Sequence, residues 1–263
     1  MQIIPIPAFQ DNYLWTLVEG SRAVVVDPGD PAPVLRELQE RQLTLEAIAI
    51  THWHPDHIGG IAELCRQFKG IPVYGPAAEE KKIPGLTQLL KEGDRVNLLG
   101  HSFQVIAVPG HTLGHIVYYA PGVLLCGDTL FSAGCGRLFE GTPSQMHSSL
   151  SRLTALPPET LVYCTHEYTL SNLAFARVVE PENGAIANQL MRVRALRGNR
   201  EPSLPTTLAL EKQINPFLRT EVPAVAQSAR QWSGGRLPDS VAVFTALRSW
   251  KDQFKAPAEA GTV

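Results

Sequence analysis

Short apolar runs separated by turn residues dominate the first two thirds of the chain. Apolar runs of this kind, bounded by glycine, proline or small polar residues, are typical of strands. They predict strands over 23–26, 46–50, 103–108, 116–119, 123–126 and 161–164. Helical periodicity predicts helices over 33–42 and 58–68, and a third helix that Ser144 caps and that runs to Leu156. This part of the chain is therefore predicted to be mixed α/β.

The pattern changes after His166, where apolar runs of the strand type vanish. Segments with helical spacing, separated by proline or glycine, predict helices over 174–179, 185–197, 206–214, 222–232 and 240–250. We therefore expect two domains, an α/β domain over 1–168 and a helical domain over 169–263. The last residues, 256–263, are predicted to form a disordered end.

The composition narrows the class of protein. The 263 residues include 23 basic and 25 acidic ones, so a formal net charge of -2 would attract neither nucleic acid nor an anionic membrane. No apolar stretch approaches the ~18 residues of a membrane span, and the proline-containing start after Met1 lacks the features of a signal peptide. The four cysteines contain no C-x-x-C pair and indicate reduced thiols. We expect a cytoplasmic protein that acts as a monomer.

Metal-ligating residue types are concentrated between the strand that ends at Ile50 and the helix predicted from Ile58. His52, His54, Asp56 and His57 form an H-x-H-x-D-H run of nitrogen and carboxylate donors, which borderline-soft divalent metals prefer. A loop at the carboxyl end of a strand is where α/β folds place their sites. In an extended loop the first two histidines point to the same side, so two metals are easier to accommodate than one.

Three further motifs each follow a predicted strand. They are Pro109-Gly110-His111-Thr112, Cys126-Gly127-Asp128-Thr129 and Thr165-His166-Glu167. With these motifs the sequence resembles the metallo-β-lactamase superfamily. The resemblance implies an α/β fold of the αββα sandwich type, followed here by the C-terminal helical domain, with the ligands converging at one edge of the two sheets.

The resemblance also implies the ligand set. It assigns His52, His54 and His111 to a first metal. It assigns Asp56, His57 and His166 to a second metal, with Asp128 between the two and a hydroxide bridging them. Asp56 and Asp128 are the catalytic carboxylates it implies. The expected cofactor is two divalent metal ions per chain. Zinc is the metal we expect, although iron and manganese suit the same ligands.

Several nearby residues remain open from sequence alone. Asp27, before Pro-Gly, either braces the histidine loop as an acceptor or only forms a turn. His101 and His147 lie outside the motifs and are expected at the surface, whereas His115 is expected to pack behind the ligands. Cys126 and Cys135 are interpreted as buried filler rather than nucleophiles.

A narrower resemblance covers essentially the whole chain. Its marks are Gly-Cys-Gly-Arg-Leu-Phe-Glu-Gly at 134–141, Thr-His-Glu-Tyr-Thr at 165–169, Asn-Pro-Phe-Leu-Arg at 215–219 and Arg-Ser-Trp-Lys-Asp-Gln-Phe at 248–254. These motifs are similar to those of the glyoxalase II family, the hydroxyacylglutathione hydrolases. The resemblance implies hydrolysis of S-(2-hydroxyacyl)glutathione, such as S-D-lactoylglutathione, to glutathione and D-lactate, the second step of methylglyoxal detoxification. The acyl preference stays open.

The glyoxalase II resemblance also implies the substrate contacts. Arg137, Tyr168, Arg248 and Lys251 would hold the carboxylate and backbone of glutathione. Phe139 stands where some relatives have tyrosine, so a hydroxyl contact to the peptide is missing there. Without the resemblance, Arg248 and Lys251, three residues apart on a helix, would be solvated charges.

Other activities of the same fold remain alternatives: a lactonase, a persulfide dioxygenase with one iron, or an RNA-processing nuclease, which the near-neutral charge disfavours. Several true β-lactamases carry arginine at the position of His57, unlike this chain. A non-catalytic metal-binding protein is the alternative from another functional class.

Overall fold

A computed structural model describes residues 1–255, so the end predicted to be disordered, 256–263, lies outside the described residues. Two six-stranded sheets face each other in this part of the chain. The first has the order β1 (Gln2–Ala8), β2 (Asn12–Glu19), β3 (Arg22–Val26), β4 (Thr44–Ala49), β5 (Val73–Pro76) and β6 (Gln88–Leu90). The second has the order β14 (Thr206–Thr207), β13 (Leu161–Cys164), β10 (Val123–Gly127), β9 (Ile116–Ala120), β8 (His101–Ala107) and β7 (Arg95–Leu98).

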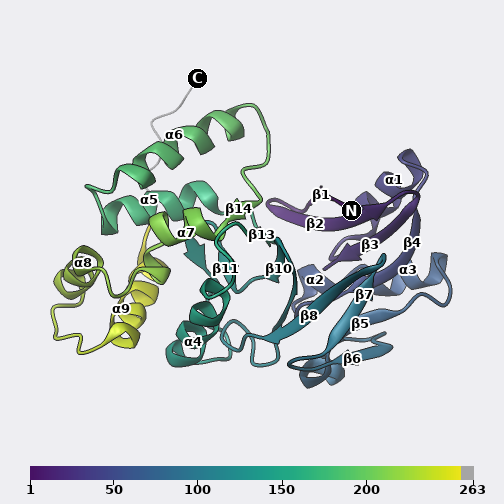
Figure 1. Cartoon of the computed structure of the whole chain (residues 1–263), viewed down its shortest axis with the longest axis horizontal. Helices are drawn as coiled ribbons and strands as arrows, with labels where there is room; N and C mark the ends of the chain where they lie inside the picture. The colour runs from purple at the N-terminus through teal and green to yellow at the C-terminus, as the bar shows by residue number, and fades with distance from the viewer. Residues whose placement is uncertain (256–263) are drawn as a thin grey trace.

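Helices cover the outer faces of both sheets, which makes the αββα sandwich predicted from the sequence (Figure 1). The first sheet is covered by α1 (Pro31–Glu40), α2 (Pro55–Ile58) and α3 (Ile61–Gln67), and a short 3-10 helix η1 (Ala77–Lys82) follows β5. On the other side lie α4 (Pro143–Thr154), α5 (Thr169–Val179), α6 (Gly184–Gly198), α7 (Leu208–Ile214), η2 (Pro216–Leu218), α8 (Pro223–Ser233) and α9 (Ser240–Gln253).

The central strands of the first sheet are buried on both faces, which explains why they appear as continuous apolar runs. In β3, Val24 and Val26 point between the two sheets, whereas Ala23 and Val25 pack beneath the covering helices. β3, β4, β5 and β6 pair in parallel, so their carboxyl ends lie at the same edge. This edge is where the predicted metal ligands of the first sheet lie.

The strands β1 and β2 were not predicted. β1 carries Pro5 and Pro7, which cannot donate to a neighbouring strand, and it accordingly lies at the edge of its sheet, paired with β2 alone. Its prolines therefore disguised a strand as an irregular start. The turn that follows ends at Asp11, and this residue and Asn12, the first residue of β2, reach the candidate site.

Two predicted helix starts were wrong for local reasons. The helix predicted over 58–68 is divided into α2 and α3 at Gly59 and Gly60, which pass so close to the carbonyl oxygens of Gly29 and Pro28 that no side chain would fit there. The cap of α4 is Thr142 rather than Ser144, and Thr142 forms a reciprocal capping box with Gln145.

The C-terminal region is helical as predicted, with corrected boundaries. Helix α5 begins at Thr169 rather than at 174, and residues 206 and 207 form the short strand β14 before Thr207 caps α7. One apolar cluster contains side chains from both sheets and from α5, α8 and α9. The division into domains at 168/169 therefore stays a prediction.

A buried carboxylate joins the helical region to the hairpin formed by β11 (Leu130–Phe131) and β12 (Gly134–Cys135). Glu211, on α7, is fully buried and accepts hydrogen bonds from Ser132 Oγ (3.0 Å), Ala133 N (2.7 Å), Thr206 Oγ1 (2.9 Å) and Asn215 Nδ2 (3.0 Å). Burial raises the pKa of this carboxyl. The hairpin leads from Asp128 toward Arg137, so its anchoring positions part of the site.

We expect Glu211→Ala to lower the free energy of unfolding by about 3 kcal/mol or more, because three buried donors, from Ser132, Ala133 and Thr206, lose their acceptor. Urea denaturation measures this change. The matched control is Glu221→Ala, at an exposed glutamate of the same region, which should stay within about 0.5 kcal/mol of the wild type. Equal effects of the two substitutions would contradict the anchoring role.

Candidate metal centre

The seven predicted ligands come from five segments that meet at one edge of the sandwich. His52 and His54 lie in the loop after β4, and Asp56 and His57 lie in α2. The others follow β8, β10 and β13, at His111, Asp128 and His166. Every one of these segments therefore places its ligand just beyond a strand, as the sequence predicted.

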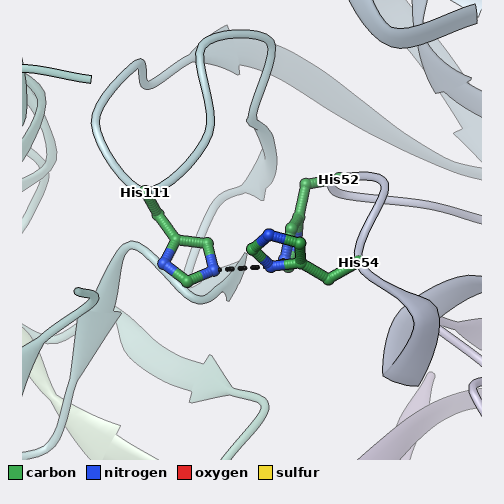
Figure 2. Close-up of side chains that lie close together, drawn as sticks. All are labelled: His52, His54 and His111. Carbon is green, nitrogen blue, oxygen red and sulfur yellow. Dashed lines mark hydrogen bonds between the residues drawn. The ribbon is translucent and has the colours of Figure 1, made fainter. Parts of the chain in front are cut away.

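His52, His54 and His111 point their rings at one another (Figure 2). His54 Nδ1 lies 3.0 Å from His52 Nε2 and 2.9 Å from His111 Nε2. One donor atom from each of the three lies within 4.8 Å of the other two. We refer to these residues as the histidine trio.

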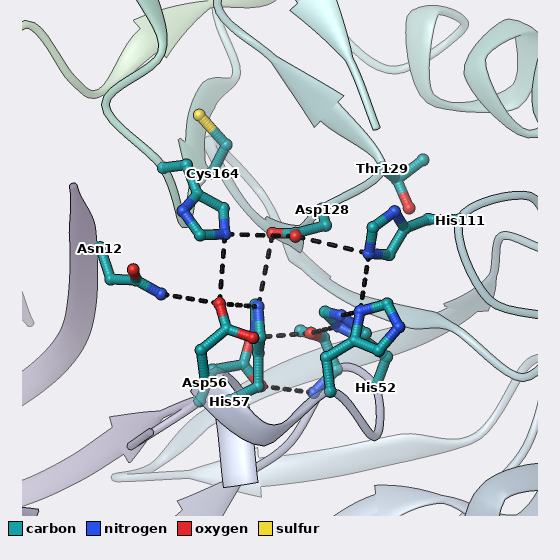
Figure 3. Close-up of polar contacts among 12 residues, drawn as sticks. Asn12, His52, Asp56, His57, His111, Asp128, Thr129 and Cys164 are labelled. Atoms are coloured by element: carbon teal, nitrogen blue, oxygen red, sulfur yellow. Dashed lines mark hydrogen bonds and ion pairs between the residues drawn. The ribbon is translucent and has the colours of Figure 1, made fainter. Parts of the chain in front are cut away.

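Asp56, His57 and His166 form a second group with donor atoms within 4.8 Å of one another. Asp128 lies between the two groups (Figure 3). Its Oδ2 is 3.5 Å from His111 Nε2 and 3.2 Å from His166 Nε2, and its Oδ1 is 3.6 Å from His57 Nε2. The same carboxylate thus faces both groups.

The donor set fits divalent metal ions. His57 Nε2 and Asp128 Oδ1 are buried without a hydrogen-bond partner in the described part of the chain. Buried polar atoms are normally satisfied, and an exception calls for an explanation such as a bound ion. Imidazole nitrogens that face one another at about 3 Å are well placed to share a cation, which agrees with the preference of borderline-soft metals for such donors.

The two groups differ in charge. Burial lowers the pKa of His52 and His111, and burial together with His111 lowers the pKa of His54 to about 4, so the trio is neutral. Burial opposes a charge on His166 as well, but Asp128 and the hydrogen bond with Asp11 raise its pKa to about 9. Neutral imidazoles have the free lone pair that a metal requires.

Asp27 supports the histidine loop, which settles the role left open by the sequence. Its Oδ1 accepts from the backbone N–H of Thr51 (2.7 Å), and its Oδ2 accepts from Thr51 Oγ1 (2.7 Å) and lies 3.1 Å from His57 Nδ1. It also forms a turn, with a positive φ of 50°. Asp27 is buried, so these bonds are shielded from water.

Sequence reasoning missed the supporting groups that come from other segments. Asp11 Oδ1 lies 2.7 Å from His166 Nδ1, and Asn12 Nδ2 donates to Asp56 Oδ2 at 3.1 Å (Figure 3). Glu79, in η1, accepts from Thr112 Oγ1 (2.5 Å) beside His111. Recognising β1 and β2 as a hairpin would have pointed to the first two.

The remaining histidines lie behind or away from the site. His115 is buried, stacks on His52 with centroids 4.6 Å apart and accepts from the backbone N–H of Asp128. His101 is a partly exposed residue next to Glu19. His147 is also partly exposed, and its ring packs edge-on against Phe244.

The cysteines are buried filler, as expected. Cys126 and Cys135 are both buried, and burial raises the pKa of the Cys126 thiol and brings that of Cys135 to about 11. Neither is therefore a thiolate nucleophile near neutral pH.

A cavity of about 630 Å³ opens from the ligand groups toward α5 and α9. Its lining contains all five predicted substrate contacts, which are Arg137, Phe139, Tyr168, Arg248 and Lys251. Phe139 is 61% exposed and Tyr168 38%, so both rings are accessible in the cavity. Ser171, Asn172, Asp252 and Phe254 also line it and were not predicted.

Arg248 and Lys251 are not the solvated charges that their helical spacing alone would suggest. Arg248 is only 7% exposed, and it donates to the carbonyl oxygen of Cys135 and to Asp252 Oδ1, both at 2.9 Å. Lys251 Nζ donates to Ser171 Oγ at 3.2 Å, and burial with the nearby Arg248 lowers its pKa to about 8. Asp252 also pairs with Arg137, at 3.4 Å.

Comparison with known families divides the chain into two consecutive matches. Residues 10–166 match the metallo-β-lactamase superfamily, and residues 167–254 match the hydroxyacylglutathione hydrolase C-terminus. A hydroxyacylglutathione hydrolase of Vibrio campbellii is 54% identical over 256 residues, which cover 97% of this chain and 100% of the relative.

Solved structures are similar over much of the chain. ETHE1 from Myxococcus xanthus is 25% identical with a TM-score of 0.64, and the match covers 95% of this chain and 98% of that protein. TTHA1623, solved in a di-iron-bound form, is 30% identical with a TM-score of 0.59, over 82% of this chain and 100% of that one. In the described residues 1–255, no helix has the length and apolar character to cross a bilayer.

We expect Asp27→Ala to weaken zinc binding by about tenfold or more, because the loop of His52 and His54 and the ring of His57 lose their support. Competition between the protein and a chromophoric chelator measures the affinity. The control is Asp30→Ala, which removes the exposed cap of α1 three residues away and should cost about 1 kcal/mol of stability without changing zinc affinity. Unchanged zinc binding in Asp27→Ala would refute the bracing role.

Proposed function

Because this chain belongs to the hydroxyacylglutathione hydrolases of the metallo-β-lactamase superfamily, we propose that its seven clustered donors bind two zinc ions beside a glutathione-binding cavity. The protein is a thioester hydrolase that converts S-(2-hydroxyacyl)glutathione, such as S-D-lactoylglutathione, to glutathione and a 2-hydroxy acid, within methylglyoxal detoxification. The observation that carries this conclusion is one cavity that contains metal-ligating residues at one end and three cationic side chains at the other.

We assign the histidine trio to the first ion and Asp56, His57 and His166 to the second, with Asp128 shared. The donor distances within each group support this division, as does the position of Asp128 between them. When bound, two such ions supply a hydroxide nucleophile near neutral pH and polarise the thioester carbonyl. Asp56 and Asp128 are the catalytic carboxylates in this proposal.

The side chains around the donors orient the substrate. Glutathione leaves as a thiolate without prior protonation, because the pKa of a thiol is about 8.5. The reaction therefore needs no general acid to protonate the leaving sulfur. We propose that Arg137, Arg248 and Lys251 bind the glutathione carboxylate, since all three cations line the cavity. Tyr168 stacks on His166 with ring centroids 4.7 Å apart, which brings its hydroxyl-bearing ring beside the donors. Phe139 offers shape but no hydroxyl.

The cellular setting is also part of the proposal. Cys65, Cys126, Cys135 and Cys164 are free thiols, which suits a reducing cytoplasm. A monomer suffices, because residues of a single chain line the cavity. The net charge of -2 argues against a nucleic-acid partner. The C-terminal match over residues 167–254 favours the thioesterase over a lactonase, a persulfide dioxygenase or a non-catalytic protein.

The decisive experiment is the release of free thiol from S-D-lactoylglutathione by the purified, zinc-loaded protein. We expect turnover with this substrate, and a kcat/KM lower by about tenfold or more for an S-lactoyl thioester that lacks the glycine carboxylate, because a charged hydrogen bond contributes about 1.5 to 3 kcal/mol. Asp128→Asn should abolish most turnover of both. Equal kcat/KM values for the two thioesters would remove the glutathione assignment.

We expect kcat/KM for the glutathione thioester to fall as the pH rises through about 8. The Lys251 ammonium, whose pKa is about 8, is charged below that pH and loses its charge above it. The fall should amount to about fivefold, less than for a fully buried pair because the lysine is partly exposed.

The matched variants are Lys251→Met, which should lack this part of the pH dependence, and Lys69→Met, an exposed lysine far from the cavity, which should retain it. Lys251 is a better position than Arg248 for testing whether the cations bind the carboxylate. Replacing Arg248 would also remove its hydrogen bond to the backbone of Cys135. Identical pH profiles for wild type and Lys251→Met would show that the lysine does not bind the carboxylate.

A further inference from the structure

His54 differs from the other histidines of the proposed metal site in how its ring is held. A histidine that binds a metal normally donates its second ring N–H to an acceptor that fixes the ring. The other four have such neighbours at Nδ1: Thr51 Oγ1 for His52 (3.1 Å), Asp27 for His57 (3.1 Å), Arg137 O for His111 (2.7 Å) and Asp11 for His166 (2.7 Å).

His54 turns its Nδ1 toward His52 and His111 (Figure 2), and no group within residues 1–255 hydrogen-bonds to its Nε2. It is also only half-buried, whereas His52 and His111 are buried. Its ring orientation must therefore come from packing. Two aromatic rings supply this packing, Trp53 with centroids 4.6 Å away and Phe139 at 5.4 Å, both edge-on.

Glu140 fixes the Trp53 ring and the loop of His111 at the same time. Its Oε1 accepts from Trp53 Nε1 (3.0 Å) and from Lys82 Nζ (2.6 Å), and its Oε2 accepts from the backbone N–H of Leu113 (2.9 Å). Lys82 Nζ also lies 4.6 Å from the centroid of the Trp53 ring. Phe139 is the residue directly before Glu140 in the chain.

We propose that Glu140 is a positioning residue that sets the zinc affinity of the histidine trio by holding the Trp53 ring and the Leu113 backbone beside His54 and His111. Glu140 does not line the cavity, so it acts through the ligands rather than on the substrate. The inference rests on the proposed assignment of the trio to one ion.

The ion pair between Glu140 and Lys82 contributes less to holding the two loops than the hydrogen bonds of Glu140 do. Lys82 is 49% exposed at the side chain, and exposed ion pairs contribute little. The two N–H donors, from the indole of Trp53 and the amide of Leu113, approach different oxygens of Glu140 and belong to the two loops that carry His54 and His111. A carboxylate is required because both oxygens must accept.

The test is Glu140→Gln, which keeps the size but places an NH2 group against one of the two N–H donors. Zinc affinity is measured on metal-free protein by competition with a chromophoric chelator. We expect one of the two zinc ions to bind about tenfold more weakly, with the other within about threefold of the wild type. With excess zinc, KM for the thioester should be unchanged.

The matched control is Glu180→Gln, which alters a buried carboxylate that pairs with Arg219 in the helical region, away from every ligand loop. It should bind both ions like the wild type. A double-mutant cycle adds a readout that a loss of stability would not move: in a His54→Ala background, Glu140→Gln should weaken zinc binding by less than about threefold, because its partner in the coupling is gone.

Wild-type affinities in Glu140→Gln, or an equal loss in Glu180→Gln, would overturn the proposal. If Glu140→Gln does not fold, Trp53→Phe replaces it, since this variant keeps an aromatic ring beside His54 and removes the indole donor. Unchanged zinc binding in Trp53→Phe would then overturn it. Binding of fewer than two ions by the wild type would instead remove the proposed dinuclear site, so the two failures are distinguishable.

Discussion

The ring nitrogens of His52, His54 and His111 approach to 2.9 and 3.0 Å, and the carboxylate of Asp128 lies across from them. The hydrogen bonds that these ring nitrogens share with one another leave lone pairs without a donor. Their approach is favourable only when cations share the lone pairs and when the surrounding chain prevents the rings from turning away. The rest of the structure meets these two requirements.

Strand ends meet the second requirement. The ligands follow the ends of strands, in loops and in α2, and most of their outer atoms meet a partner from another segment. Asp27 holds the loop of His52 and the ring of His57, and Asp11 faces His166. Where this arrangement lacks a hydrogen bond, at His54, packing against Trp53 and Phe139 takes its place.

The helical region completes the site rather than standing beside it. Glu211, on α7, accepts hydrogen bonds from the β11–β12 hairpin, and Arg248, which lines the cavity, donates to the carbonyl oxygen of Cys135 in the same hairpin. The same hairpin runs from Asp128 to Arg137, so one rigid segment connects the donors with the cationic end of the cavity. This connection gives a physical reason for the two matched families to occur in one chain.

The sequence by itself determined the α/β class, the helical C-terminal region and the clustered donors, because each donor sits in a compact motif after an apolar strand. It missed β1, whose prolines hide an edge strand, and with it Asp11 and Asn12. Only the tertiary structure decided which common residues support the donors. Glu79 and Glu211 carry no local signal, because their partners Thr112 and Ser132 lie 33 and 79 positions away, and only folding brings such pairs together. Glu140 stands in a motif that the sequence marks, but its partner Trp53 lies 87 positions away and only the fold identifies it.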